Sequence, residues 1–241
     1  MQQMDASSVR LHWRSDADSG LSGVLERRKP CAPAVPTTRA GDEQSIALGP
    51  LVTAAIAAST RQLAEARALV ESRYAWRGYA LQADDAVSTL PGTTLIATQG
   101  ARTVGTLTLR VDGPAGLAAD ECYREAINLV RHAGRRVCEL TRLAIDTAAN
   151  WRPTLGALIG LAYEVGSVRY GVSDVFVEVN PRHARFYQQT FGFDTAAGKQ
   201  ICPRVKAPAV LLRLEVERLD ARLREIGALP RSLSQPRTQY A

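Results

Sequence analysis

The segment VFVEVNPRHARFYQQTFGF, residues 175–193, joins a strand pattern directly to a helix pattern. The run DVFVEVN at 174–180 is rich in β-branched residues, which is typical of a strand. A short helix is expected over 182–189, and Gly192 follows where glycine commonly ends a helix. The segment therefore predicts a strand and a short helix in succession, a unit found in mixed α/β domains.

Working outward, the spacing of apolar residues predicts further helices and strands around this unit. Their order is helix, strand, strand, helix, strand, helix, strand, helix, strand, which indicates a mixed central sheet flanked by helices. Neither a G-x-G-x-x-G fingerprint nor a P-loop pattern occurs, which disfavours nicotinamide enzymes, kinases and ATPases. The expected helices span 59–77, 119–132 and 152–170, the strands span 93–98, 102–111, 136–146 and 207–216, and a closing helix is an option over 217–227.

Composition divides the chain into one domain and two flanking segments. Residues 1–50 are rich in Pro, Ser, Asp and Gly and have little apolar periodicity, so a disordered leader is expected there. Residues 51–227 carry the helix and strand patterns and form the expected α/β domain. Residues 228–241 are expected to form a flexible tail.

The overall composition is that of an ordinary globular protein, with 46% hydrophobic and 22% charged residues. Four cysteines and three histidines are scattered along the chain, so no metal site is expected. No apolar run approaches the roughly 18 residues of a membrane span. The sequence also begins without a basic-then-apolar secretory leader. A cytoplasmic protein without stable membrane insertion is expected.

The net charge of +6 is concentrated near the C-terminus, where residues 181–241 hold eleven Lys and Arg against five Asp and Glu. A localised basic surface favours an acidic partner, such as a nucleic acid or an acidic carrier protein. No RNA-binding aromatic signature, zinc finger or helix-turn-helix pattern supports nucleic acid, so none is expected as a partner. The plain alternative is a solvated basic tail.

Several segments resemble known acyltransferases. Residues 175–193, with Asn180 after the strand and Phe186-Tyr187 on the helix, resemble the closing half of the GNAT acyltransferase fold. A second series is similar to LuxI-type autoinducer synthases and resembles even more closely the related FeeM-type N-acyl amino acid synthases. This series runs RYAWRGYAL (73–81), Asp84-Asp85, VGTLTLRVD (104–112), ELTRLAID (139–146) and PRVKAPAVLLRLEV (203–216).

The resemblance implies transfer of a long-chain fatty acyl group from acyl carrier protein to the amino group of an amino acid. No metal or redox cofactor takes part, and the expected partners are the carrier protein and a small amino acid acceptor. Three alternatives stay open. They are a LuxI-like homoserine lactone synthase that uses S-adenosylmethionine, a coenzyme A-dependent N-acetyltransferase, and a non-catalytic GNAT-like module that binds an acyl ligand.

Glu139 and Arg142 lie in one expected strand, and Glu139 is the candidate base that accepts a proton from the attacking amine. Side chains alternate along a regular strand, so these two residues would point to opposite faces. A β-bulge near 140–144 would bring both to one side. A shared catalytic role for Glu139 and Arg142 therefore requires a bulge. The alternative is that each residue forms a separate structural ion pair, which a regular strand would allow.

The remaining candidates follow from the same chemistry. Backbone N–H groups near Leu143-Ala144 could stabilise the oxyanion, and Tyr187 could protonate the leaving thiolate or simply pack as an aromatic residue. Arginines can hold the acceptor carboxylate by paired hydrogen bonds. Arg73, Arg110 and Arg142 match the LuxI-type pattern by order, and Trp76, Asp84 and Asp85 are further substrate-binding candidates.

Two more expectations concern the acyl donor. In AANWRPTLGALIG (148–160), Arg152 and Gly156 are one position too far apart for a coenzyme A loop, and Pro153 removes an N–H donor. A carrier-protein donor tolerates this loss, although a divergent coenzyme A loop is the alternative. Docking of the acidic carrier is expected on the basic C-terminal quarter, at Arg182, Arg185, Arg204 and Lys206, with Lys199 and Arg213 beside them.

Overall fold

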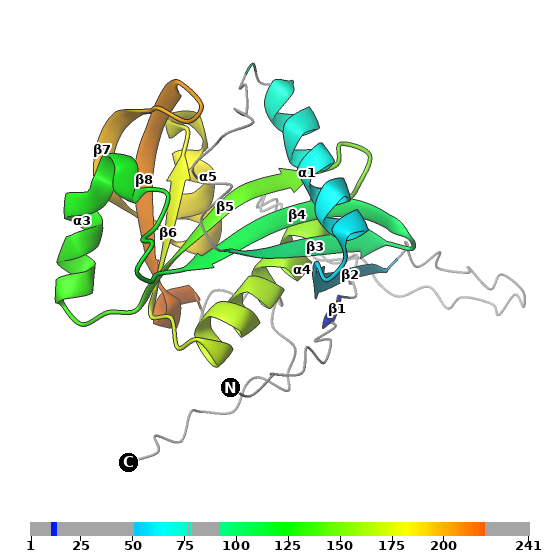
Figure 1. Cartoon of the computed structure of the whole chain (residues 1–241), viewed down its shortest axis with the longest axis horizontal. Helices are drawn as coiled ribbons and strands as arrows, with labels where there is room; N and C mark the ends of the chain where they lie inside the picture. Colours follow the sequence, from blue (N-terminus) through cyan, green and yellow to red (C-terminus); the bar gives the residue numbers. More distant parts are fainter. Residues whose placement is uncertain (1–10, 14–50, 77, 79–91, 220–241) are drawn as a thin grey trace, which may run out of the picture.

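A computed structural model describes residues 11–13, 51–76, 78 and 92–219 of the protein. Helices and strands alternate along the chain. The strands form a central sheet, and the helices pack beside it (Figure 1). Their order is β1 (Leu11–Trp13), β2 (Val52–Ile56), α1 (Thr60–Ala75), β3 (Thr93–Gln99), β4 (Arg102–Val111), α3 (Asp120–His132), β5 (Val137–Ile145), α4 (Trp151–Tyr163), the π-helical turn η1 (Glu164–Arg169), β6 (Asp174–Val179), α5 (Pro181–Phe191), β7 (Asp194–Cys202) and β8 (Ala207–Glu215).

The strand–helix unit expected over 174–192 is confirmed, and its boundaries have local causes. The side chain of Asn180 accepts a hydrogen bond from the Arg182 N–H at 3.2 Å, which caps the start of α5. Pro181 occupies the first turn, where an N–H group would have no carbonyl partner within the helix, so the missing donor of proline costs no hydrogen bond. Gly192 ends the helix with φ of 81°, a left-handed conformation that glycine adopts without strain.

Three strands were not expected from the sequence. β7 contains Gly198, Lys199 and Gln200, and it forms because it pairs with β8 at the edge of the sheet. β2 begins the domain and pairs with β3. β1 lies within the segment expected to be a disordered leader and pairs with β2. The rest of that segment, the tail at 228–241 and most of the optional closing helix lie outside the described residues.

The strands form one eight-stranded sheet in the order β1-β2-β3-β4-β5-β6-β8-β7. Neighbouring strands are antiparallel except β5 and β6, which are parallel. These two strands pair only over 137–139 and 174–176, so they diverge beyond Glu139 and Phe176. The sheet is therefore split on one side, and the C-terminal halves of β5 and β6 form the two sides of the opening.

A β-bulge interrupts β5 in the half that borders this opening. Thr108 pairs with Thr141 and Thr106 pairs with Ala144, so two residues of β5, at 142 and 143, lie opposite one residue of β4. The bulge predicted near 140–144 is confirmed. Arg142 has φ of 55° within it, a conformation that non-glycine residues rarely adopt.

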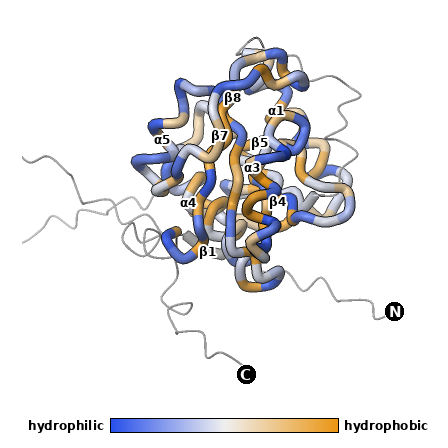
Figure 2. Tube along the Cα trace, turned by 90° about the vertical axis from the view of Figure 1, so that its left-hand side faces the viewer, coloured by the Kyte–Doolittle hydropathy of each residue, from blue (hydrophilic) through white to orange (hydrophobic). Residues whose placement is uncertain are grey.

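Two hydrophobic cores hold the helices on opposite faces of the sheet. α4 packs in the larger core with Val175 and Val177 of β6, whereas α3 packs in the smaller core with Phe176 and Leu211. Successive side chains of a strand point to opposite faces, so α3 and α4 cover different faces. In Figure 2, β8 runs largely in the hydrophobic colour and α5 is largely hydrophilic.

Close approach between α4 and the sheet depends on Gly105 of β4. A Cβ atom at this position would lie 2.6 Å from Cγ2 of Thr154 and 3.1 Å from Cδ1 of Leu158. The missing side chain lets the helix lie directly on the strand. None of the helices in the described part of the chain is long and apolar enough to cross a bilayer.

Candidate active site

A cavity of about 530 Å³ lies at the split in the sheet. One wall comes from β5, from Glu139 and from 141–145, and the opposite wall comes from 178–180 at the end of β6. The C-terminal end of α1, the first turns of α5 and the segment 204–209 before and within β8 complete it. The cavity therefore gathers residues that are far apart in sequence at the place where the strands diverge.

The bulge brings Glu139 and Arg142 to this one cavity. Without the extra residue the two side chains would lie on opposite faces of β5. Leu143 and Ala144, the candidate oxyanion-binding segment, line the same wall. The structure thus groups four of the predicted site residues at the split.

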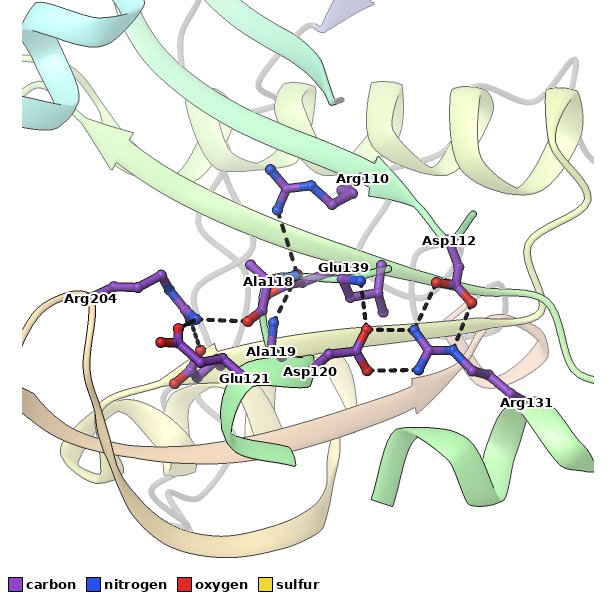
Figure 3. Close-up of polar contacts among 11 residues, drawn as sticks. Arg110, Asp112, Ala118, Ala119, Asp120, Glu121, Arg131, Glu139 and Arg204 are labelled. Atoms are coloured by element: carbon purple, nitrogen blue, oxygen red, sulfur yellow. Dashed lines mark hydrogen bonds and ion pairs between the residues drawn. The ribbon is translucent and has the colours of Figure 1, made fainter. Parts of the chain in front are cut away.

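Glu139 is fully buried, and its two carboxylate oxygens have different surroundings. Oε2 accepts hydrogen bonds from the N–H groups of Ala118 at 2.7 Å and Ala119 at 3.4 Å. Nη1 of Arg110 lies 3.7 Å from the same oxygen (Figure 3). Oε1 is buried and makes no hydrogen bond to any described residue. Oε1 therefore has no hydrogen-bond donor from the part of the chain that the structure describes.

Burial raises the pKa of the Glu139 carboxyl to about 7, against the opposing effects of Arg110 and of the Ala118 N–H. A carboxyl group that titrates near neutral pH can accept a proton and release it again under physiological conditions. Glu139 is thus suited by its environment to acid–base chemistry.

An ion-pair clamp fixes the loop that donates to Glu139. Arg131 of α3 makes paired contacts with Asp112, at 2.7 Å, and with Asp120, at 2.7 and 2.8 Å (Figure 3). Asp120 in turn accepts the Leu117 N–H at 2.7 Å. This clamp holds the chain between β4 and α3 so that the next N–H group, that of Ala118, points at the glutamate.

A second carboxylate, Glu178, lines the opposite wall of the cavity and was missed from the sequence. Its side chain is only 6% exposed, and Oε2 forms an ion pair with Nη2 of Arg204. Its Oε1 is buried without a hydrogen bond to any described residue. The available signal is a second carboxylate, besides Asp174, in the largely apolar run DVFVEVN, and that pattern by itself predicts only a strand.

The structure corrects two of the docking candidates. Arg204 is 14% exposed and uses its guanidinium inside the protein, on Glu178, on Glu121 at 2.7 Å and on the Ala118 carbonyl at 2.7 Å. Arg213 is paired with Asp174 at 2.6 Å. Neither is the open surface cation that docking would require. Among the other candidates, Arg182, Arg185, Lys199 and Lys206 are exposed.

The remaining predicted residues are placed unevenly around the cavity. Arg73 lines it, and its guanidinium lies 5.3 Å from the ring centroid of Trp76, which is 75% exposed and is not part of the lining. Arg110 is buried behind Glu139 and does not line the cavity. Asp84 and Asp85 lie outside the described residues.

Tyr187 lines the cavity from α5 within an aromatic cluster. Its ring makes edge-to-face contacts with Phe186, at 5.5 Å between centroids, and with Phe193, at 5.8 Å. Both expected roles, at the site and in packing, are therefore compatible with one position.

The N-terminus of α4 also borders the cavity through Trp151. Of the N–H groups in its first turn, that of Arg152 donates to the side chain of Asn150 at 3.3 Å, and Pro153 has none. A pyrophosphate would find few backbone donors here. No group of three or more metal-ligating side chains occurs among the residues that the structure describes.

Comparison with known proteins identifies the family. The family model described as N-acyl amino acid synthase FeeM matches residues 65–215. The chain belongs to the FeeM family of N-acyl amino acid synthases. No curated protein sequence is significantly similar to the chain.

Solved structures show that the FeeM-type chain has the expected GNAT acyltransferase fold. The structure of FeeM from uncultured soil microbes is 24% identical with a TM-score of 0.66, and the match covers 75% of this chain and 99% of that one. The autoinducer synthase LasI is 14% identical with a TM-score of 0.51, covering 70% and 91%. RimJ from Mycobacterium smegmatis, in complex with CoA-disulfide, is 11% identical with a TM-score of 0.50, covering 74% and 90%.

Proposed function

We propose that the protein transfers a long-chain fatty acyl group from acyl carrier protein to the amino group of an amino acid. The observation that carries this proposal is the Oε1 oxygen of Glu139, a buried acceptor without a hydrogen bond to any described residue, on a residue that lines the cavity. Membership of the N-acyl amino acid synthase family supports the reaction type. The products are an N-acyl amino acid and the free carrier thiol.

Glu139 acts as the general base in the proposed reaction. The acceptor enters as an ammonium, and Glu139 takes one proton from it directly or through a water molecule. The neutral nitrogen then attacks the thioester carbon. The C–N bond forms, the carbonyl becomes an oxyanion, and N–H groups near Leu143-Ala144 stabilise that charge. When the C–S bond breaks, the thiolate takes a proton from Tyr187, and the Tyr187 phenolate recovers one from the nitrogen, which loses its second proton as the amide forms. Glu139 then releases the first proton to solvent.

The reaction as proposed uses the acyl thioester as a substrate and calls on no metal or redox cofactor. Aminolysis of a thioester needs one nucleophile, one base and a stabilised oxyanion, and it involves no oxidation or reduction. Arg142 and Arg73, which both line the cavity, can hold the acceptor carboxylate by paired hydrogen bonds.

Two features favour a carrier-protein donor over coenzyme A. The first turn of α4 offers few N–H donors to a pyrophosphate, and the pantetheine arm of a carrier protein has no pyrophosphate of that kind. Arg182 and Arg185 are exposed on α5, the helix that also lines the cavity with His183 and Phe186. An acidic carrier can dock on these arginines while its arm enters the cavity.

The test is to incubate the full chain with long-chain acyl carrier protein and a pool of the protein amino acids, and to seek N-acyl products by mass spectrometry. We expect a product whose formation falls by about 10²-fold or more in Glu139→Gln. Glu121→Gln is the matched control, because Glu121 is a nearby exposed carboxylate that does not line the cavity. Products formed only with S-adenosylmethionine or only with acyl-coenzyme A would contradict the proposal.

A further inference from the structure

Glu178 occupies an unusual place for a charged side chain. It lies on β6 two residues after Phe176, so it shares the sheet face that carries α3 and Glu139. Apart from Asp174 at its start, the rest of the strand is apolar, and the Glu178 side chain is 6% exposed. A buried carboxylate is retained only when partners compensate its charge. Arg204 compensates it through one oxygen, Oε2, which leaves Oε1 to be explained.

Oxygens without hydrogen bonds gather at this cavity. Among the described residues, the buried side-chain oxygens without a hydrogen bond include Oε1 of Glu139, Oε1 of Glu178 and Oγ1 of Thr141. All three residues line the same cavity. Such oxygens are rare in folded proteins, and several in one cavity indicate a ligand that supplies donors. Two of the three belong to carboxylates, so the ligand group should be a cation.

We propose that Glu178 is a specificity-determining residue. Together, Glu139 and Glu178 hold the ammonium group of the acceptor between their two Oε1 oxygens. The inference rests on the proposed function and assigns the acceptor class to amines that bind as ammonium ions. A primary ammonium has three N–H donors, enough for both oxygens and one further contact. Glu139 then removes one of these protons, and Glu178 keeps the nitrogen in place.

The charges around the cavity fit a zwitterion. Arg110 and Arg204 balance Glu139 and Glu178 within the protein, through contacts to their Oε2 oxygens. The ammonium interacts with the two Oε1 oxygens, and Arg142, which lies within the bulge and lines the same cavity, can bind the acceptor carboxylate. A 2-hydroxy acid of the same shape lacks the ammonium and should not bind.

The alternative is that Glu178 only keeps Arg204 in place. Glu121 provides the control, because it also pairs with Arg204, at 2.7 Å, but is 47% exposed and lies outside the cavity lining. Glu178→Gln removes the charge in the cavity, whereas Glu121→Gln removes only a partner of Arg204. Glu178→Asp keeps the charge and shortens the side chain.

Steady-state kinetics with acyl carrier protein and the amino acid pool separate these roles. We expect Glu178→Gln to raise the half-saturating pool concentration about tenfold or more, with the KM for the acyl carrier within about threefold of wild type. Glu178→Asp should recover part of the loss, and Glu121→Gln should match wild type. Unchanged acceptor saturation in Glu178→Gln, or an equal effect of Glu121→Gln, would overturn the assignment.

A binding measurement keeps the test independent of turnover. The amino acid pool should raise the melting temperature of the wild type and of Glu121→Gln but not of Glu178→Gln, and the matching pool of 2-hydroxy acids should raise none of them. If the wild type makes no N-acyl product yet shows this pattern, the proposed function fails and the ammonium site stands. If product forms but the pattern is absent, the ammonium site fails alone.

Discussion

Replacing Arg110 by methionine should make the Glu139 carboxyl harder to ionise. Nη1 of Arg110 lies 3.7 Å from Oε2 of Glu139, and both side chains are buried. At this distance and an effective dielectric constant of about 20, the attraction is about 4 kcal/mol. One pKa unit corresponds to about 1.4 kcal/mol, so removal of the cation could raise the pKa of Glu139 by up to about three units. Relaxation of the site reduces this shift, and we expect at least about one unit.

The assay is the pH dependence of kcat/KM for N-acylation, which reports the ionisation of the free enzyme. In the wild type the acidic limb should titrate at about 7, the pKa of Glu139. In Arg110→Met the limb should move to higher pH, because the carboxyl keeps its proton longer without the neighbouring cation. Arg110→Lys retains a positive charge and is the matched control, with a smaller shift. Circular dichroism and thermal melting show whether each variant is folded.

One result would refute this reasoning. If folded Arg110→Met keeps the acidic limb of the wild type while its KM for the amino acid rises, Arg110 binds the acceptor carboxylate. That outcome would restore the role expected from the sequence. It would also mean that the buried position of Arg110 behind Glu139 changes when substrate binds.

Other predictions concern stability. Gly105→Ala should lower the free energy of unfolding by about 1–3 kcal/mol, because the new Cβ would lie 2.6 Å from Thr154, whereas Gly113→Ala meets nothing within 4 Å and should be near neutral in the same denaturant titration. Tyr123→Phe should cost about 1–2 kcal/mol, measured by thermal melting, because a buried β8 carbonyl loses its 2.8 Å hydrogen bond. The native Glu139 carboxyl holds its proton up to about pH 7, above its unfolded value of 4.5, so its contribution to stability should fall as pH rises through this window. The expected loss in the free energy of unfolding across this window is about 3 kcal/mol. Urea titrations at several pH values should show this loss in the wild type and not in Glu139→Gln. Equal slopes of stability against pH in the two proteins would contradict the prediction.

Local patterns were sufficient to predict most of the fold. The helices α1, α3, α4 and α5 and the strands β3 to β6 and β8 follow from apolar spacing and turn residues, because those patterns reflect which side of each element is buried. β7 could not be predicted in this way. Its hydrogen bonds to β8 come from a neighbour in space, and its own residues carry no strong strand preference.

Strand geometry predicts part of the site, whereas composition alone misplaces Arg204 and overlooks Glu178. The conflict between strand alternation and a shared role for Glu139 and Arg142 required a bulge, and the structure contains it. Counting basic residues suggested Arg204 for docking, but a count cannot show that a carboxylate lies beside it. For the same reason Glu178 was overlooked, since its importance depends on a strand split that no local pattern encodes.

The bulge in β5 benefits the active site at a cost to the stability of the sheet. If residue 142 were deleted, Leu143 would follow Thr141 directly, and the hydrogen-bonded ladder between β4 and β5 would be continuous. The deletion would also remove a backbone in the left-handed region and so relieve strain. The shortened chain would be the more regular sheet protein and the poorer enzyme. Laboratory selection for thermal tolerance alone would therefore be expected to erase this insertion, and selection for turnover to keep it.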